Sequence, residues 1–370
     1  MKKILVINPG STSTKFAVYH DEEAVFTKTL RHQGEELAPY PNVASQYEFR
    51  KETILNALKE EGIAIEFDII VGRGGLLRPI ASGVYEVNEE MRETLLAAKY
   101  GEHACNLGGL IAADIAKGLG CKAVIADPVV VDELQDVARI SGRPEIPNLS
   151  IFHALNQKAI ARRYAKEEGK AYEELNVIVA HLGGGVSVGA HQKGKVIDVN
   201  CALGGDGPFS PERVGTLSAS GLMNLCFSGK YTKDEVKKML IGNGGLMAHL
   251  GLNDAYQVEI KAEKEGDPQA KLIYDAMAYQ VGKAIGDKAA VLKGKVDAIL
   301  ITGGIAYGKG FVKYIADMVE FIAPVKVYPG EDELGALASN GLRSQAENSP
   351  RRSRIKVQAT ASGRISDNIC

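Results

Sequence analysis

A run of hydroxyl side chains follows the first apolar stretch of the chain. It reads Asn8-Pro9-Gly10-Ser11-Thr12-Ser13-Thr14-Lys15 and joins the apolar runs 3–7 and 16–19. Small residues in a turn let backbone N–H groups approach a polyanion, and hydroxyl groups add donors. Asn8 ends the first run, where its carboxamide can meet a metal-bound water. The run therefore predicts a phosphate-binding turn with contacts from Ser11, Thr12, Ser13 and Lys15.

Two glycine-rich stretches have a similar character. One reads His181-Leu182-Gly183-Gly184-Gly185 between apolar runs, and the other reads Thr302-Gly303-Gly304 directly after an apolar run. Consecutive glycines cost backbone entropy, so either stretch is an irregular turn or a place of close approach. A glycine loop at a strand end suits a phosphate or lets a purine lie flat. We predict nucleotide contacts from His181, Gly183, Gly184, Gly185, Gly303 and Gly304.

Charged residues in loops form a third group of candidates. Arg73 lies in the glycine loop 71–78, and Arg213 lies in Pro211-Glu212-Arg213-Val214-Gly215. A surface arginine is usually only solvated, but arginines in glycine loops at strand ends more often bind anions. Asp127 follows the apolar run 123–126, where α/β proteins place functional carboxylates. Arg73, Arg213 and Asp127 are therefore candidates for the chemistry of an anionic substrate.

An acidic run near the end of the chain allows two interpretations. Glu331-Asp332-Glu333 follows Pro329-Gly330 and a strand-like run. It is either the first turn of a helix, where the helix dipole favours carboxylates, or a neighbour of Mg²⁺. The sequence favours neither, so Glu331 and Asp332 join Asn8 as metal candidates.

The elements that position these residues repeat along the chain. Three short apolar runs with turns between them, at 3–7, 16–19 and 24–30, predict a meander of strands. The same pattern returns at 176–180, 186–190 and 196–199, which indicates a duplicated unit. Further strands and helices are predicted elsewhere, the strands at 69–71, 123–126, 298–302 and 325–328, and the helices at 88–95, 107–119, 150–168 and 272–285. The sum is an α/β protein in two halves.

Three of the predicted helices and the C-terminal tail carry specific expectations. Asn88 and Ser150 are expected to cap helices, and Leu272 is expected on the apolar face of its helix. From about Ser339 the chain is rich in arginine and shows no apolar period. We expect this tail to be disordered or poorly packed.

Bulk composition excludes several classes of protein. The 370 residues, 45% of them apolar, suffice for two domains of ordinary size. A net charge of -2 gives no general attraction to nucleic acid or an anionic membrane. The five cysteines form no CxxC pair, which predicts reduced thiols in a cytoplasmic protein. No apolar stretch is long enough to span a bilayer.

The motifs together resemble those of the acetate and butyrate kinase family, within the superfamily of sugar kinases, heat-shock chaperones and actin. The resemblance covers residues 1 to about 342. The opening run at 6–15 is the most specific part, and the others follow in the family's order: the Arg73 loop, 102–106, 127–130, 152–156, 181–185, 211–215, 303–304 and 329–334. Gly183-Gly184-Gly185, where acetate kinases usually have Gly-Asn-Gly, and the shortened Arg73 loop are similar to the butyrate branch.

The resemblance implies an actin-like fold of two duplicated domains, each a mixed β-sheet flanked by helices, with a nucleotide cleft between them. It places an acyl-substrate domain at 1–145, to which 334–370 returns, and a nucleotide-binding domain at 146–333. It implies ATP and Mg²⁺ as cofactors, a short-chain fatty acid as substrate, and a homo-oligomer with no nucleic-acid or membrane partner. Arg73 and Arg213 would neutralise the transferred phosphoryl group, His153 would hydrogen-bond to it, and Asp127 would orient Arg213 or the nucleophile.

Three other functions compete with phosphorylation of butyrate or a branched short-chain acid. The first is an acetate or propionate kinase of the same fold. The second is a non-catalytic ATP clamp of the actin and chaperone kind, which would not need the loop arginines or His153. The third is a sugar kinase, which would need a catalytic aspartate, and the surroundings of Asp127 do not match one.

Overall fold

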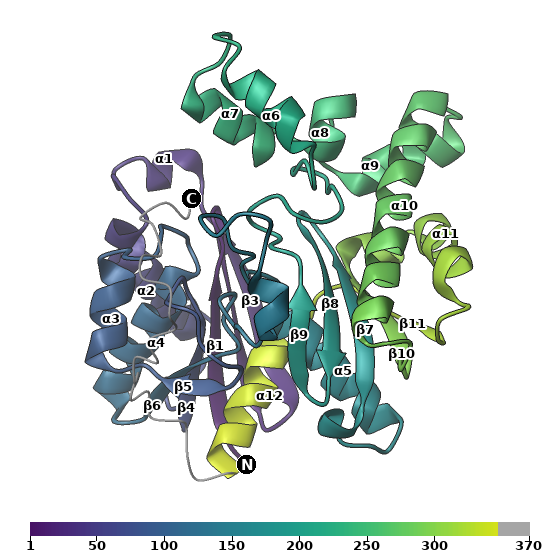
Figure 1. Ribbon diagram of the computed structural model, residues 1–370. Coiled ribbons are helices and arrows are strands. Elements are labelled where there is room, and N and C mark those ends of the chain that lie inside the picture. The colour runs from purple at the N-terminus through teal and green to yellow at the C-terminus, as the bar shows by residue number, and fades with distance from the viewer. Residues whose placement is uncertain (347–370) are drawn as a thin grey trace. The chain divides into compact units, whose positions relative to one another are not determined.

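The computed structural model describes residues 1–346, which divide into two compact units. Unit 1 comprises Met1–Val131 and residues 332–346, and unit 2 comprises Asp132–Glu331. Each unit contains one mixed β-sheet with helices on its faces (Figure 1). Among residues 1–346, no helix combines the length and the apolar character that crossing a membrane requires.

The sheet of unit 1 has six strands in the order β3-β2-β1-β4-β6-β5. The first three strands are antiparallel, β1, β4 and β6 are parallel, and β5 returns antiparallel to β6. The strands span Lys3–Pro9 (β1), Ser13–His20 (β2), Glu23–Arg31 (β3), Ile69–Arg73 (β4), Val84–Glu86 (β5) and Lys122–Ala126 (β6). The parallel strands β1 and β4 are almost entirely buried, as expected for strands covered on both faces.

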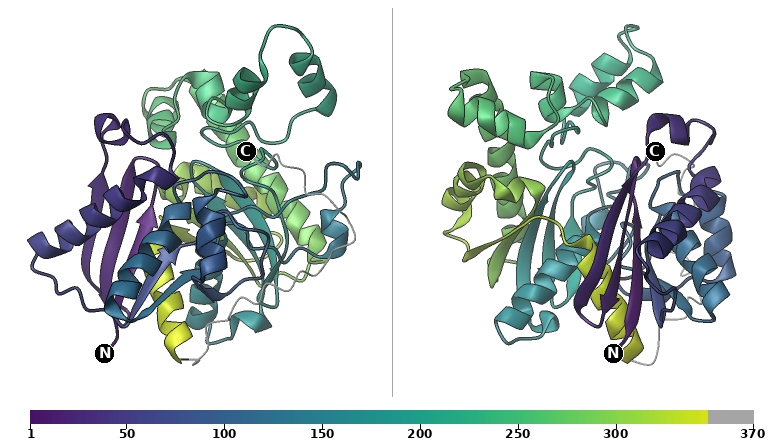
Figure 2. Two further views of the ribbon diagram at one scale, coloured as in Figure 1. Left: turned by 90° about the vertical axis from the view of Figure 1, so that its left-hand side faces the viewer. Right: turned by 180° about the vertical axis from the view of Figure 1, so that it is seen from behind.

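Helices cover both faces of this sheet. Figures 1 and 2 show α2, α3 and α4 on one face and α12 on the other. Gly72 and Gly341 permit this close packing: a side chain at Gly72 would strike the Gly108 carbonyl of α4, and one at Gly341 of α12 would strike Val71. The helices are α1 (Gly34–Leu37), α2 (Tyr47–Glu60), α3 (Glu89–Leu96), α4 (Asn106–Leu119) and α12 (Glu333–Ala346), with a 3₁₀ turn at Ala44–Gln46.

The sheet of unit 2 has five strands in the order β11-β10-β7-β8-β9. They span Asn176–Leu182 (β7), Val186–Gln192 (β8), Lys195–Val199 (β9), Ala298–Gly303 (β10) and Val325–Pro329 (β11). β7, β8 and β9 form an antiparallel meander, and β10 and β11 run parallel to β7. This repeats the arrangement of β1, β2, β3, β4 and β6 in unit 1, so the predicted duplication and the two mixed sheets are confirmed.

The helices of unit 2 also cover two faces of its sheet. Ile178 of β7 packs on the side of α10 and α11, whereas Val177 packs on the side of α5. The helices are α5 (Ala154–Glu167), α6 (Ala219–Cys226), α7 (Lys233–Leu240), α8 (Gly245–Leu250), α9 (Ala255–Glu259), α10 (Pro268–Val291) and α11 (Lys309–Val319). Short 3₁₀ helices occupy Asp136–Arg139, Tyr172–Glu174 and Gly304–Tyr307, and a π-helix occupies Ile260–Lys264.

Of the three specific expectations for helices, one is confirmed and two are wrong. The Asn88 side chain accepts the Met91 N–H and caps α3, as predicted. The predicted cap at Ser150 is wrong, because α5 begins at Ala154, while the Ile151 carbonyl instead accepts the Ala202 N–H. Leu272 was expected on the buried face of α10 but is 67% exposed.

The expectation of a disordered tail from Ser339 is wrong as far as Ala346, because these residues belong to α12. The buried side of this helix includes Leu337, Ala338, Asn340 and Ser344. It lacks a continuous apolar period because small and polar side chains lie where the helix approaches the sheet closely. The remainder of the predicted tail, 347–370, lies outside the described residues.

Candidate active site

The hydroxyl turn lies where predicted, between the first two strands of unit 1. β1 ends at Pro9, β2 begins at Ser13, and the Gly10 N–H donates to the Ser13 carbonyl across 2.8 Å. Ser11 and Thr12 are exposed. The turn therefore presents small hydroxyl residues to the surroundings, as a phosphate contact requires.

A buried arginine, which sequence reasoning missed, stabilises this turn by hydrogen bonds to its backbone carbonyls. Arg50 of α2 is fully buried and donates to the backbone carbonyls of Gly10 (2.7 Å), Ser11 (2.8 Å) and Ser13 (3.0 Å). Its guanidinium also donates to Thr14 Oγ1 and to the side chain of Gln46. In a trans peptide the N–H points opposite to the carbonyl, so the Ser11 and Thr12 N–H groups point away from Arg50.

Replacing Arg50 with methionine should destabilise the protein by about 2–4 kcal/mol, because several buried carbonyls would lose their donor. The check is urea unfolding of wild type and Arg50→Met, with Arg143→Met as the control. Arg143 is exposed, and within residues 1–346 its hydrogen bonds are local, with Ser141, Glu145 and Ile146, so its loss should have little effect. Equal unfolding midpoints for wild type and Arg50→Met would contradict the structural role given to Arg50.

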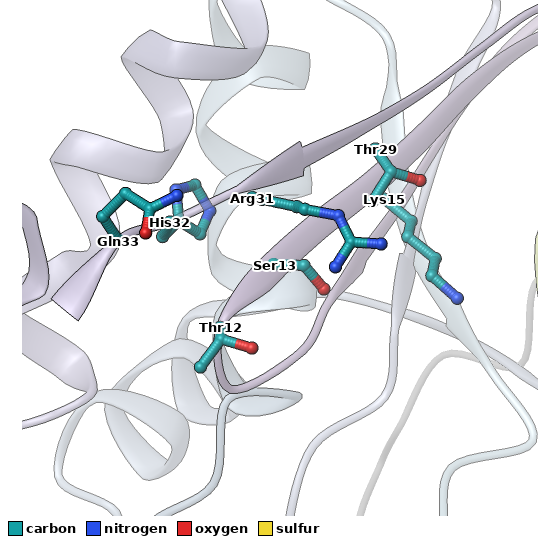
Figure 3. Close-up of a pocket in the computed structure, with 7 residues that line it drawn as sticks. All are labelled: Thr12, Ser13, Lys15, Thr29, Arg31, His32 and Gln33. Atoms are coloured by element: carbon teal, nitrogen blue, oxygen red, sulfur yellow. The ribbon is translucent and has the colours of Figure 1, made fainter. Parts of the chain in front are cut away.

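A polar hollow of about 360 Å³ opens beside the turn on the exposed face of β2 and β3 (Figure 3). It gathers three predicted phosphate contacts with four further residues; its lining is Thr12, Ser13, Lys15, Thr29, Arg31, His32 and Gln33. Arg31 stands opposite Ser13 in the strand pairing, and Thr29 stands opposite Lys15. Lys15 and Arg31 make this a cationic surface suited to an anion.

His32 fixes one wall of the hollow. Burial, and then the positive charge of Arg50, lower the pKa of His32, so its ring is neutral near pH 7. His32 Nε2 lies 2.9 Å from Thr14 Oγ1. The neutral ring can therefore join the hydroxyl network without adding a second buried charge beside Arg50.

Asn8, Arg73 and Glu333 form a compact polar cluster at the ends of β1 and β4. Arg73 Nη1 lies 3.1 Å from Asn8 Oδ1 and 2.9 Å from the Glu333 carboxylate, and Asn8 Nδ2 donates to Glu333 across 2.6 Å. Two of these three residues were predicted, whereas Glu333 was left out of the metal candidates. The signal was present, because Glu333 continues the acidic run.

The two predicted carboxylates of this acidic run lie in different surroundings. Asp332 Oδ1 accepts the Gly335 N–H across 2.8 Å in the first turn of α12, as in the helix-turn interpretation. Glu331 belongs to unit 2, and its carboxylate lies 3.2 Å from His181 Nε2.

Asp127 occupies a strained position after β6. Its φ is +36°, which side chains rarely adopt, and its carboxylate accepts hydrogen bonds from Ser82 Oγ (2.6 Å) and the Gly83 N–H (2.9 Å). Asp127 is 1% exposed. These contacts hold the end of the loop between β4 and β5, so Asp127 acts at least in part on that loop.

Two histidines of unit 2 lie face to face. The rings of His153 and His181 stack with centroids 3.8 Å apart and planes 14° apart. His153 is the residue before α5, and His181 lies near the end of β7, at the position that Asn8 has in β1. His181 Nδ1 is 2.8 Å from Asn156 Oδ1. The structure thus brings together two of the residues singled out in the sequence.

The glycine turn and Arg213 complete this cluster. A side chain on Gly185 would come within 2.1 Å of Arg213 Nη1 and 3.5 Å of His153 Cε1, so the absence of one leaves room for the guanidinium. Arg213 Nη1 donates to the Ala202 carbonyl across 2.6 Å. Burial lowers the pKa of Arg213, yet a guanidinium still remains charged near pH 7. Arg213, His153 and Gly185 therefore present a cation and an imidazole beside a bare backbone.

Gly303 and Gly304 have different environments. Gly303 has φ +95°, and a side chain on it would strike the Leu182 backbone at 2.2 Å, so its glycine is needed for packing. A side chain on Gly304 would meet nothing within 4 Å. Of this predicted pair, Gly304 is the one that leaves open backbone for a ligand.

Solved structures show which class of protein shares this fold. An acetate kinase from Porphyromonas gingivalis matches 93% of this chain and 99% of its own with a TM-score of 0.77 and 19% identity. A propionate kinase from Francisella tularensis matches 93% and 100% of the two chains with a TM-score of 0.73 and 20% identity. The fold is therefore that of short-chain acid kinases, and the predicted fold class is confirmed.

Sequence relatives place the chain more closely. Residues 150–326 match the model of the acetokinase family. Butyrate kinase 2 of Clostridium acetobutylicum is 58% identical over 92% of this chain and 96% of its own length. A probable butyrate kinase of Bacteroides thetaiotaomicron is 58% identical over the same shares. The chain belongs to the acetokinase family, and the predictions of a kinase with a carboxylate acceptor and of ATP use are confirmed.

Proposed function

We propose that this protein transfers the γ-phosphoryl group of ATP to the carboxylate of butyrate, forming butyryl phosphate and ADP. The observation that carries the substrate is the 58% identity, over 92% of the chain, to proteins named butyrate kinases. The acetate and propionate kinases share only the fold at 19% and 20% identity, so they do not bear on the acid.

The chemistry needs cations and hydrogen-bond donors rather than a general base. A carboxylate is already ionised near neutral pH, so the obstacle is repulsion between two anions. Arg73 and Arg213 supply guanidinium groups for this purpose, and His153 supplies a ring N–H to a phosphoryl oxygen. Asp127 supports the reaction by holding the loop between β4 and β5.

The nucleotide phosphates would be held by backbone and hydroxyl donors. In unit 1 these are Ser11, Thr12 and Ser13, with Lys15 as the nearby cation. In unit 2 they belong to the turn Gly183-Gly184-Gly185, with His181, and to the loop at Gly304, whose shape depends on Gly303. Such donors suit phosphates because they need not reorganise on binding.

The donors of unit 1 also fit Mg²⁺. Asn8 Oδ1 and the Glu333 carboxylate lie within one cluster with Arg73, and carboxylate and carboxamide oxygens are ligands that Mg²⁺ accepts through water. Asn8 and Glu333, with Asp332 beside them, would hold the ion, which when bound neutralises phosphate charge. Glu331 would serve His181 instead. The homo-oligomeric state and the cytoplasmic location stay predictions of the family resemblance.

A series of acids tests the substrate. Initial rates with acetate, propionate, butyrate, isobutyrate and valerate, measured by ADP release, should give the highest kcat/KM for butyrate. Each methylene group is worth about 1–3 kcal/mol in an apolar pocket, so acetate should be lower by at least about ten-fold. A higher kcat/KM for acetate or propionate would move the substrate within the family, and one for isobutyrate would favour a branched acid.

A further inference from the structure

A buried chain of hydrogen bonds leads from His153 into the core of unit 2. Ser187 Oγ lies 2.8 Å from His153 Nδ1 and 2.8 Å from Gln157 Nε2. Gln157 Oε1 lies 2.9 Å from His191 Nε2, and the Tyr172 hydroxyl lies 2.6 Å from His191 Nδ1. Ser187, Gln157 and His191 are fully buried, and Tyr172 is 4% exposed.

We propose that Ser187 and Gln157 are positioning residues that hold the neutral ring of His153 with its proton on Nε2. The proposal rests on the role in phosphoryl transfer proposed above for His153. It follows from the direction of each hydrogen bond in this buried series. One side chain in the series has its orientation set by a backbone carbonyl.

The fixed member is the side-chain amide of Gln157. Its Nε2 lies 3.0 Å from the backbone carbonyl oxygen of Ser187, as well as 2.8 Å from Ser187 Oγ. A carbonyl oxygen can only accept, so the atom facing it must be the nitrogen of the amide. The two amide hydrogens therefore go to the two Ser187 oxygens, and Oε1 faces His191.

The hydrogen bonds of His191, at the other end of the buried series, agree with this orientation of the Gln157 amide. Because Gln157 Oε1 only accepts, His191 Nε2 must carry a hydrogen. Burial, and then the positive charges of Lys158 and Arg162, lower the pKa of His191 well below its ordinary value, so the ring is neutral. Its Nδ1 is then an acceptor, and the Tyr172 hydroxyl donates to it.

The hydrogen bond between Ser187 and His153 bears on the tautomer of His153. Ser187 Oγ already accepts a hydrogen from Gln157, so its own hydrogen is available for His153 Nδ1. In the proposed arrangement Ser187 Oγ donates this hydrogen to His153 Nδ1, and in the neutral ring the proton then sits on Nε2.

This assignment matters for phosphoryl transfer. A ring with hydrogen on Nε2 can donate from that atom to an anionic phosphoryl oxygen, whereas the other tautomer would present a lone pair there and repel it. Ser187→Ala removes the donor to Nδ1 and allows both tautomers. We expect kcat to fall about ten-fold, as for loss of one orienting hydrogen bond, with little change in KM.

The direct test is ¹⁵N NMR of the histidine rings in the full-length protein, with the His153 signals identified by their loss in His153→Gln. In wild type at pH 8, Nδ1 of His153 should show the shift of an unprotonated ring nitrogen and Nε2 that of a protonated one. Ser187→Ala should mix the two tautomers. A wild-type ring protonated on Nδ1, or a Ser187→Ala spectrum identical to wild type, would overturn the proposal.

Tyr172→Phe is the matched control, since it removes one buried hydroxyl from the same chain beyond the fixed amide. The Ser187 carbonyl still orients Gln157 in this variant, so the His153 spectrum and kcat should stay close to wild type. Equal losses of kcat in both variants, with an unchanged His153 ring, would show a merely structural role and overturn the proposal. The NMR result does not depend on butyrate being the substrate, so failure of the proposed function is seen separately.

Discussion

Replacing Arg73 with alanine is expected to lower kcat/KM for butyrate by about 10³- to 10⁵-fold, the range seen when a phosphoryl-transfer enzyme loses an arginine finger. The guanidinium lies 3.1 Å from Asn8 Oδ1 and 2.9 Å from the Glu333 carboxylate, so these three side chains form one polar cluster. Without Arg73, the carboxylate and the phosphoryl group would repel each other with less screening, and Glu333 would add an unneutralised charge. Steady-state kinetics measures the effect.

Arg92→Ala is the matched control for this variant. Arg92 also belongs to unit 1, is exposed to a similar extent (23% against 24%) and pairs with carboxylates of Glu89 and Asp114. The ion pairs of Arg73 and of Arg92 are all partly exposed, so either substitution should lower the free energy of unfolding by only about 1 kcal/mol. Only Arg73→Ala should lose activity. An Arg73→Ala protein that is folded and retains kcat/KM within about ten-fold of wild type would remove Arg73 from the mechanism.

Gly185→Ala is expected to reduce kcat about 10²- to 10³-fold, comparable to the loss of one donor to the transition state. The added methyl group would lie 2.1 Å from Arg213 Nη1 and 2.9 Å from its Cζ, so the guanidinium must move. Because the obstructing atoms are the end of a flexible side chain, the displacement should cost little stability. Kinetics and urea unfolding of the same preparation separate the two effects.

A glycine outside the proposed site supplies the control. A methyl group on Gly286 of α10 would meet no atom within 4 Å, so Gly286→Ala should leave both Arg213 and kcat unchanged. A double-mutant cycle then tests the cause: added to Arg213→Ala, the Gly185 substitution should have little further effect. Equal losses in the two glycine variants, or full additivity with Arg213→Ala, would show that Gly185 does not act through Arg213.

Local sequence patterns predicted most of the secondary structure because strands here are short apolar runs ended by turns. The duplicated meanders, the strands β4, β6, β10 and β11, and the cap at Asn88 all follow from neighbours in sequence. The cap at Ser150 failed because a contact with Ala202, distant in sequence, sets the path before α5. The end of α12 was missed because its buried face uses small and polar residues.

The residues of the candidate site also fall into two groups: those that can be recognised in the sequence, and those that only the fold brings together. Glycines, hydroxyl groups and loop arginines can be recognised in sequence because their types are unusual for their positions. Arg50 could not be, since it lies among the charged residues of α2 and looks like a solvated side chain until the fold buries it. Gln157 and His191 were missed for the same reason, because only the packing of α5 on β8 places them in one chain of hydrogen bonds.

The most direct test of the account is trapping of the acyl phosphate with hydroxylamine, using ATP, Mg²⁺ and butyrate with wild-type protein. A parallel reaction contains acetate, and a control contains Arg73→Ala. The account predicts butyryl hydroxamate, in step with ADP release, well above the acetyl product and absent with the variant. Folded protein that binds ATP but yields no hydroxamate with either acid would contradict it and favour an ATP clamp.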